Sequence, residues 1–222
     1  ANAIQIAFAD PANDQLDQVS SAQGIYVKQT TGDLILGNIS AGNAIQLAAT
    51  GSIYAEAGFT DRTAIHILGT DLDLRAGGDI GFNGSVFQPL QLNISGTMTG
   101  SAVGDLSILA VTGDLAVGAS GTYGTLRAGG ALTLNVARGA LTVNADIGSG
   151  GLMQLLADRG MTFAAGTSAA PVTVTSSSNG VTLVAATLSM GAYSAINAAG
   201  LISVTTTGDA TIGQLNSSQS YA

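Results

Sequence analysis

The chain has 222 residues; 46% are hydrophobic, only 9% are charged and 5% are aromatic, and the formal net charge is −8. The absence of cysteine excludes disulfides, thiolate metal sites and cysteine nucleophiles. The six basic residues are scattered singly, which argues against nucleic-acid binding and against attraction to an anionic membrane. No apolar run reaches the ~18 residues of a membrane span, so we expect no direct membrane insertion.

A short turn–strand–turn phrase occurs three times along the chain. Each copy opens with Thr-Gly-Asp and continues through apolar or small residues to a second glycine, as at 31–37, 112–118 and 207–213. Recurrence of this kind predicts a stack of repeated units rather than a globular domain built around one pocket. The residues expected to form structural turns at its corners are Gly32, Asp33, Gly113, Asp114, Gly208 and Asp209.

The turn residues are assigned distinct roles. The glycines are expected to adopt positive φ, where a residue without a Cβ meets no steric penalty. The aspartates are expected to accept hydrogen bonds from nearby backbone N–H groups. Asp33, Asp114 and Asp209 lie far apart in the sequence, a spacing that keeps their like charges off successive coils.

Between the glycines, apolar and polar residues alternate, as in 44–48, 90–94, 132–136 and 172–174. A period of two predicts half-buried strands, and the low aromatic content fits a narrow interior with little room for rings. No long stretch carries a convincing helical stripe; segment 152–157, bounded by glycines, is equally compatible with a strand. The residues expected to point inward are Leu34, Leu36, Ile45, Leu47, Leu72, Leu74, Leu132, Leu134, Val172, Val174, Leu183, Ile202 and Val204.

The glycine turns recur at short and nearly regular intervals over most of the chain, as from Gly160 to Gly180 and from Gly180 to Gly200. A second phrase, Leu-Arg-Ala-Gly-Gly, occurs at 74–78 and again at 126–130. Strands this short cannot bury an apolar face alone, but parallel stacking of successive coils solves the problem. We therefore predict an all-β right-handed parallel β-helix (β-solenoid) with coils of roughly 20 residues. It forms one segment over 1–222, excised from a longer array, with a loop insertion near 78–89.

Two segments resemble filamentous-haemagglutinin-type bacterial exoproteins. Residues 31–42, TGDLILGNISAG, are similar to the coil phrase of these adhesins, and residues 76–81 followed by 89–97 are similar to a further phrase. The resemblance covers nearly the whole chain as a pattern. It implies a right-handed β-helix, export across the bacterial outer membrane, and work as a secreted or surface-attached adhesin. It also implies a secretion domain with Asn-Pro motifs, which this sequence does not contain.

The polar residues that could carry chemistry are few. His66, the only histidine, alternates with Ile65 and Ile67 and is expected to face outward on a strand. Asp71 and Asp73 share a strand face and could hold calcium together with Asp79, but we interpret them as solvated carboxylates. We assign no catalytic, cofactor-binding or metal-binding residue.

The candidate binding residues lie where the repeat is disturbed. Phe82, Asn83 and Phe87 fall in one such stretch, and Phe59 and Arg62 fall in another. Insertions in solenoids often map to loops on the binding face. An equally open interpretation is that these rings plug the core locally.

The sequence favours a non-enzymatic, adhesive shaft segment of a bacterial adhesin, located outside the cell or on its surface. Its expected partner is a glycan or protein of a host, cell surface or matrix, and its exposed strands are expected to allow end-to-end self-association. One alternative is a carbohydrate-active β-helix enzyme, which would need acidic residues converging in one groove. Another is a glycan-binding module that uses the loop from Phe82 to Phe87.

Overall fold

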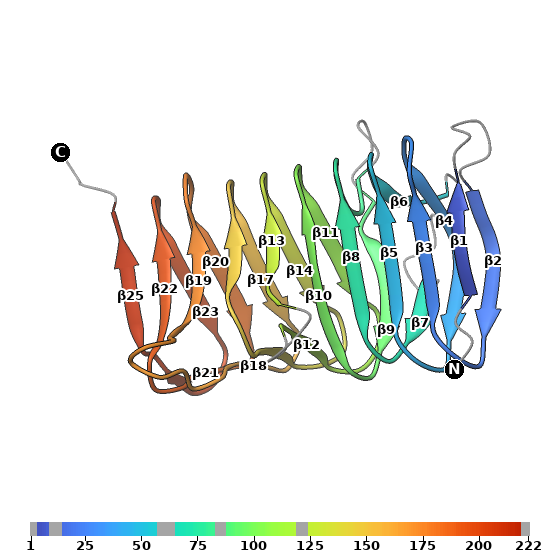
Figure 1. The fold of residues 1–222 in the computed structure, drawn as a ribbon. Coiled ribbons are helices and arrows are strands. Elements are labelled where there is room, and N and C mark those ends of the chain that lie inside the picture. Colours follow the sequence, from blue (N-terminus) through green and yellow to red (C-terminus); the bar gives the residue numbers. More distant parts are fainter. Residues whose placement is uncertain (1–3, 9–14, 57–64, 83–87, 119–123, 219–222) are drawn as a thin grey trace.

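The structure, a computed structural model, describes residues 4–8, 15–56, 65–82, 88–118 and 124–218. These residues form a stack of parallel strands, with the N- and C-terminal ends at opposite ends of the stack (Figure 1). The described parts of the chain contain no helix, and therefore none long and apolar enough to cross a membrane. The prediction of a parallel β-helix is confirmed.

Three faces can be distinguished by following the strand ladders. Face A is continuous from one end of the stack to the other, face B runs beside it, and face C is added in the C-terminal half. Face A contains β1 (Ile4–Phe8), β3 (Ile25–Gln29), β5 (Ile45–Ala49), β8 (Leu72–Ala76), β10 (Thr97–Ala102), β13 (Leu126–Ala128), β16 (Ile147–Ser149), β19 (Val172–Ser176), β22 (Ser194–Ala198) and β25 (Gln214–Ser217). Face B contains β2 (Gln15–Ser21), β4 (Leu34–Ala41), β6 (Ile53–Ala55), β7 (Ile67–Gly69), β9 (Leu90–Ile94), β11 (Leu106–Ala110), β14 (Leu132–Val136), β17 (Met153–Ala157), β20 (Val181–Ala185) and β23 (Ile202–Thr206). Face C contains β12 (Leu115–Val117), β15 (Leu141–Val143), β18 (Gly160–Phe163), β21 (Thr187–Met190) and β24 (Ala210–Thr211).

The coils average about 22 residues but are not equal in length. On face A, Ile45 pairs with Ile25 on one side and with Leu72 on the other, and the second step spans a longer piece of chain than the first. On face B, Ile80 bridges to Leu106 and Leu90 pairs with Ile108. The partners Leu106 and Ile108 are close neighbours in sequence, whereas Ile80 and Leu90 are not. The additional chain of this coil therefore lies within the stretch 78–89.

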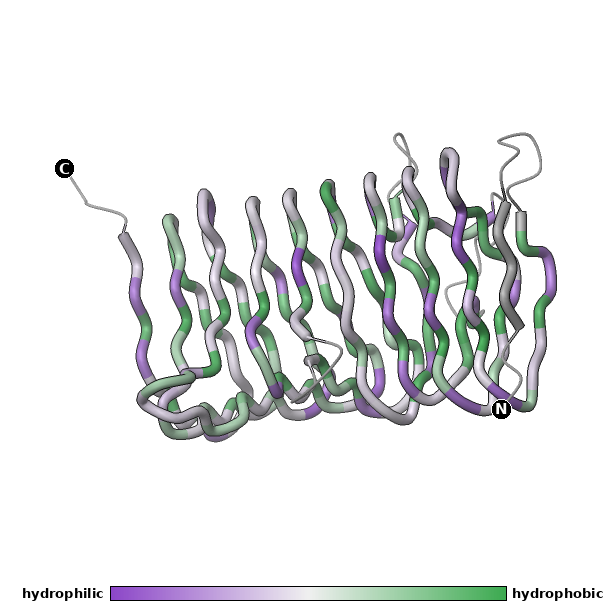
Figure 2. Tube along the Cα trace, viewed as in Figure 1, coloured by the Kyte–Doolittle hydropathy of each residue, from purple (hydrophilic) through white to green (hydrophobic). Residues whose placement is uncertain are grey.

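The interior is filled by the apolar residues of the alternating pattern. Eleven of the thirteen residues predicted to point inward are buried; the other two, Ile202 and Val204 on β23, are half-buried and pack against the core. Hydrophobic and hydrophilic residues alternate along the tube in Figure 2. The expectation that rings have little room needs one correction, because Phe163 on β18 is fully enclosed, with only 1% of its surface exposed.

The three Thr-Gly-Asp phrases occupy corners of two different kinds. Asp33 precedes β4 on face B, whereas Asp114 and Asp209 precede β12 and β24 on face C. Gly32 and Gly113 adopt the predicted positive φ, at 82° and 81°. Gly208 does not, so the expected backbone conformation is wrong for the third copy. The same local sequence therefore turns the chain at more than one place in the coil.

Aspartates at the corner between faces A and B join successive coils. Asp33 Oδ1 accepts a hydrogen bond from the backbone N–H of Ser52 at 2.7 Å, and Ser52 Oγ accepts one from Asp79 N–H at 3.0 Å. Asp79 Oδ1 accepts from Asp105 N–H, and Asp105 Oδ1 accepts from Ala131 N–H, both at 2.7 Å. The prediction of local bonding is wrong here, since each bond reaches the next coil. Like charges do stack at Asp79 and Asp105, each compensated by a backbone donor.

Many corner glycines are needed because successive coils approach closely. A Cβ on Gly129 would lie 2.0 Å from the carbonyl oxygen of Val103, and one on Gly77 would lie 2.1 Å from that of Thr50. Neither glycine has positive φ. These two positions therefore require the lack of a side chain rather than an unusual backbone conformation.

Replacing Gly129 with alanine is expected to lower the free energy of unfolding by about 1–3 kcal/mol, because the new methyl group forces two coils apart. Gly148→Ala is the matched control, since its Cβ would find no atom nearer than 3.7 Å. Urea unfolding followed by circular dichroism measures both. Equal stabilities for the two variants would contradict the assigned role of Gly129.

Candidate functional site

The predicted binding loops can be followed only in part. Asn83, Phe87, Phe59 and Arg62 lie outside the described residues. Phe82 is half-buried and follows Gly81, whose φ is 71°. A binding role for these loops remains a prediction.

His66 does not face outward as the alternating pattern predicts; it is fully buried. Its Nδ1 accepts a hydrogen bond from the backbone N–H of Gln91 at 3.0 Å, and its backbone N–H donates to the Gln91 carbonyl at 2.9 Å. Burial lowers the pKa of His66 from its usual 6.5 to about 4, since removal from water penalises the charged ring. His66 stands at a bend just before β7, and both it and Ile67 are buried, so the alternation fails there. The geometry gives His66 a structural role.

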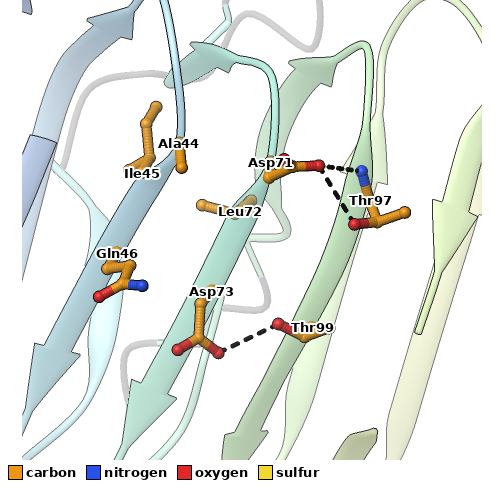
Figure 3. Close-up of a pocket in the computed structure, with 8 residues that line it drawn as sticks. All are labelled: Ala44, Ile45, Gln46, Asp71, Leu72, Asp73, Thr97 and Thr99. Atoms are coloured by element: carbon orange, nitrogen blue, oxygen red, sulfur yellow. Dashed lines mark hydrogen bonds between the residues drawn. The ribbon is translucent and has the colours of Figure 1, made fainter. Parts of the chain in front are cut away.

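Asp71 and Asp73 lie on face A beside Thr97 and Thr99 of the next coil (Figure 3). Asp71 Oδ1 accepts hydrogen bonds from the backbone N–H of Thr97 at 2.8 Å and from its hydroxyl at 3.1 Å. Asp73 is only 8% exposed and accepts from Thr99 Oγ1 at 3.2 Å. The interpretation of both as simple solvated carboxylates is therefore wrong.

The arrangement does not form a recognisable cation cage. Asp79 belongs to the corner between faces A and B, where its carboxylate bonds to Asp105 N–H. Among the described residues, no group of three His, Cys, Asp or Glu side chains is placed to hold a metal ion. Asp71 and Asp73 act as acceptors that fasten one coil to the next.

Two rows of outward residues follow face A from coil to coil: one contains Gln46, Asp73 and Thr99, and the other lies two positions later in each strand. We call the second of these rows the face-A row. The strand register pairs each member with its neighbour on the next coil, and its members in order are Lys28, Ala48, Arg75, Ser101, Arg127, Gly148, Thr175, Asn197 and Asn216. Three of the six basic residues of this acidic chain thus share one line. They stand on alternate coils, separated by the small residues Ala48 and Ser101.

The two arginines of the row are held in the same way. Arg75 Nε donates to Asp73 Oδ2 at 2.9 Å, and Arg127 Nε donates to Thr125 Oγ1 at 3.1 Å. In each case the acceptor lies two positions earlier, on the same outward side of the chain. The side chain of Arg75 is nevertheless 60% exposed, and Arg127 is exposed as well. Fixing Nε leaves the terminal N–H groups of each guanidinium available.

Beyond Arg127 the row becomes uncharged and is bordered by hollows. One hollow is lined by Arg127, Gly148, Thr175 and Ser177. Gly148 contributes no side chain to it, and Arg127 Nη1 lies 3.7 Å from where a Cβ on Gly148 would be.

A second hollow lies further along, against Asn197 and Asn216. Asn216 Nδ2 donates to Asn197 Oδ1 at 2.7 Å, so the amides themselves form a ladder. Both hollows are shallow; the first is lined by the Arg127 guanidinium, hydroxyl groups, Ala128 and glycine backbone, and the second by amide and hydroxyl groups with two alanines.

Sequence reasoning did not find the face-A row, although a signal for it was present. The repeated Leu-Arg-Ala-Gly-Gly phrase contains both Arg75 and Arg127. The register pairs each of them with Ser101, so the distance between the two copies of the phrase equals two coils. To recognise the row from the sequence, one needs the length of the coils between Arg75 and Arg127. The glycine intervals elsewhere in the chain are shorter and do not reveal that length.

Comparison with known proteins finds no match: neither a protein-family model, nor a curated protein, nor a solved structure matches the chain. The function must therefore be argued from the geometry of the chain itself.

Proposed function

We propose that this chain is a non-enzymatic shaft segment of a large secreted or surface-attached bacterial adhesin. The observation that supports the proposal is the uninterrupted ladder of face A, which joins β1 to β25 through parallel pairings. In a stack of this kind each coil contacts only its neighbours, so the chain makes an elongated body whose stiffness comes from backbone hydrogen bonds. Polar, weakly charged outer faces suit repeated contacts along its length. The resemblance to filamentous-haemagglutinin-type phrases supports the same role.

An enzymatic role is the second candidate, and the acidic pair Asp71 and Asp73 is the observation that favours it. Two carboxylates on one side of a strand are the minimum for acid–base cleavage of a glycosidic bond. However, the Asp71 carboxylate accepts a hydrogen bond from Thr97, and the Asp73 carboxylate accepts one from Thr99. Asp73 also forms an ion pair with Arg75. These bonds link successive coils and leave the carboxylates a structural role, so we prefer the shaft role.

Surface display tests the proposal. Bacteria that carry the chain on an outer-membrane anchor should adhere to cell- or matrix-coated surfaces more strongly than bacteria that carry a Leu134→Asp variant, whose core cannot close around a charge. When the purified protein is incubated with polysaccharides, the number of free polysaccharide ends should not increase. Equal adhesion of both strains, or polysaccharide cleavage that Asp71→Asn abolishes, would reject the shaft role.

A further inference from the structure

We propose that the face-A row binds a linear, carboxylated polysaccharide that lies along the axis of the stack. Arg75 and Arg127 would pair with acidic groups of the polymer, while the uncharged part of the row would contact its hydroxyl groups. The inference goes beyond the shaft role and does not depend on it, because it concerns direct binding by the isolated chain.

The positive charges of the face-A row are spaced to suit a linear polymer. Neighbouring strands of a sheet are ~4.8 Å apart, so Arg75 and Arg127, two coils apart, are separated by roughly 10 Å. Lys28 lies two coils from Arg75 in the opposite direction, with Ala48 between them. The row therefore presents evenly spaced cations with small residues between them. A polymer with an acidic group at every second or third unit meets such a row in register.

Both arginines are held in a geometry that suits carboxylate binding. Each Nε is engaged by a neighbour two positions earlier, which restricts the long side chain before any ligand arrives. The remaining N–H donors are suited to bidentate contact with a carboxylate. Arg127 bonds to the neutral hydroxyl of Thr125, so its charge is not cancelled by this contact. Arg75 is paired with Asp73, which makes Arg127 the stronger of the two anchors.

The chemistry of the rest of the row distinguishes a polysaccharide from a nucleic acid. Each strand of duplex DNA carries a phosphate about every 3.4 Å along the helix axis, a charge density that three cations roughly 10 Å apart cannot match. The net charge of −8 also repels a dense polyanion. Thr175, Asn197 and Asn216, which continue the row, are donors and acceptors of the kind that sugar hydroxyls need. The hollow beside Gly148 leaves room for a ring next to Arg127.

The test uses oligomers of hyaluronan, in which every second sugar carries a carboxylate, of increasing length and titrated calorimetrically into the full chain. The Arg75→Gln/Arg127→Gln double variant should bind at least about tenfold more weakly, as expected when two charge-assisted contacts are lost. Arg138→Gln/Arg159→Gln is the matched control, because both residues are exposed, lie outside the row and change the net charge equally. It should bind like the original chain. The affinity of the original chain should rise once an oligomer is long enough to span both arginines. The variants Arg75→Gln and Arg127→Gln, tested singly, should not show that rise.

Three results would overturn the inference. They are unchanged binding in the Arg75→Gln/Arg127→Gln variant, an equal loss in the Arg138→Gln/Arg159→Gln control, and binding of neutral dextran or oligothymidylate as tight as that of hyaluronan. Circular dichroism of each variant must match the original chain, which separates loss of binding from loss of fold. Arg127→Lys provides a further check: it keeps the charge but loses the fork of donors, so it should recover only part of the affinity.

Discussion

Replacing Phe163 with alanine is expected to lower the free energy of unfolding by about 3–5 kcal/mol, the usual cost of truncating a buried aromatic residue. Phe163 is fully enclosed on β18, where the register places it between Val143 on the preceding coil and Met190 on the following one. Loss of the ring leaves a cavity in contact with both neighbours. Because each coil is supported only by adjacent coils, the damage cannot be spread over a larger core.

Tyr193→Ala is the matched control for this experiment. Tyr193 is exposed and has φ of 56°, a strained conformation that alanine would share. Its truncation should change stability by less than about 0.5 kcal/mol, as is usual for surface positions. Urea unfolding gives both values. Similar losses for Phe163→Ala and Tyr193→Ala would show that the interior of face C is not packed as described.

The parallel β-helix could be predicted because its cause is local. Alternation at Leu132, Leu134 and Val136 gives a strand with one apolar side, and so short a strand cannot bury that side without a neighbour. Glycine turns at short, nearly regular intervals bring the chain back, so that the next strand can pack beside the previous one. Most of the core therefore follows from pattern alone. Ile202 and Val204 are only half-buried because, among the described strands, β23 pairs with β20 alone. The alternating pattern does not indicate how many strands lie against β23.

The hydrogen-bonded aspartates could not be predicted because the coils differ in length. Asp33, Ser52, Asp79 and Asp105 occupy equivalent corners, yet the sequence intervals between them are 19, 27 and 26. No constant period connects them. Longer excursions within some coils displace the register, and only the pairing of the flanking strands restores it. The face-A row was hidden for the same reason, although its two arginines stand in a repeated phrase.

His66 illustrates a different limit of sequence reasoning. The pattern around it is correctly recognised as a strand, and Ile67 is buried as expected. The error concerns one residue, at the bend just before β7, where two consecutive side chains are buried. Alternation holds within a strand but not at the bend before it. A buried histidine therefore arose where a surface one was expected.

The stability of the chain should consequently fall as the solution is acidified from neutral pH. The pKa of His66 is about 4 in the folded chain and 6.5 when unfolded, so the unfolded state binds the proton more readily. The stabilisation is complete above pH 6.5 and is lost as the pH falls towards 4. The full loss is about 3 kcal/mol, from the difference in pKa. Protonation also removes the acceptor that Nδ1 offers to Gln91 N–H.

The His66→Asn variant separates this effect from the titration of carboxylates over the same range. An asparagine side-chain oxygen can still accept from Gln91 N–H but does not gain a proton. Urea unfolding of both proteins at intervals between pH 7.5 and pH 4 gives two curves, and their difference isolates the histidine. The difference should grow in favour of the variant as the pH falls below about 6.5. A difference that stays constant with pH would mean that His66 takes up protons in the folded chain as easily as in the unfolded one, and that its burial carries no electrostatic cost.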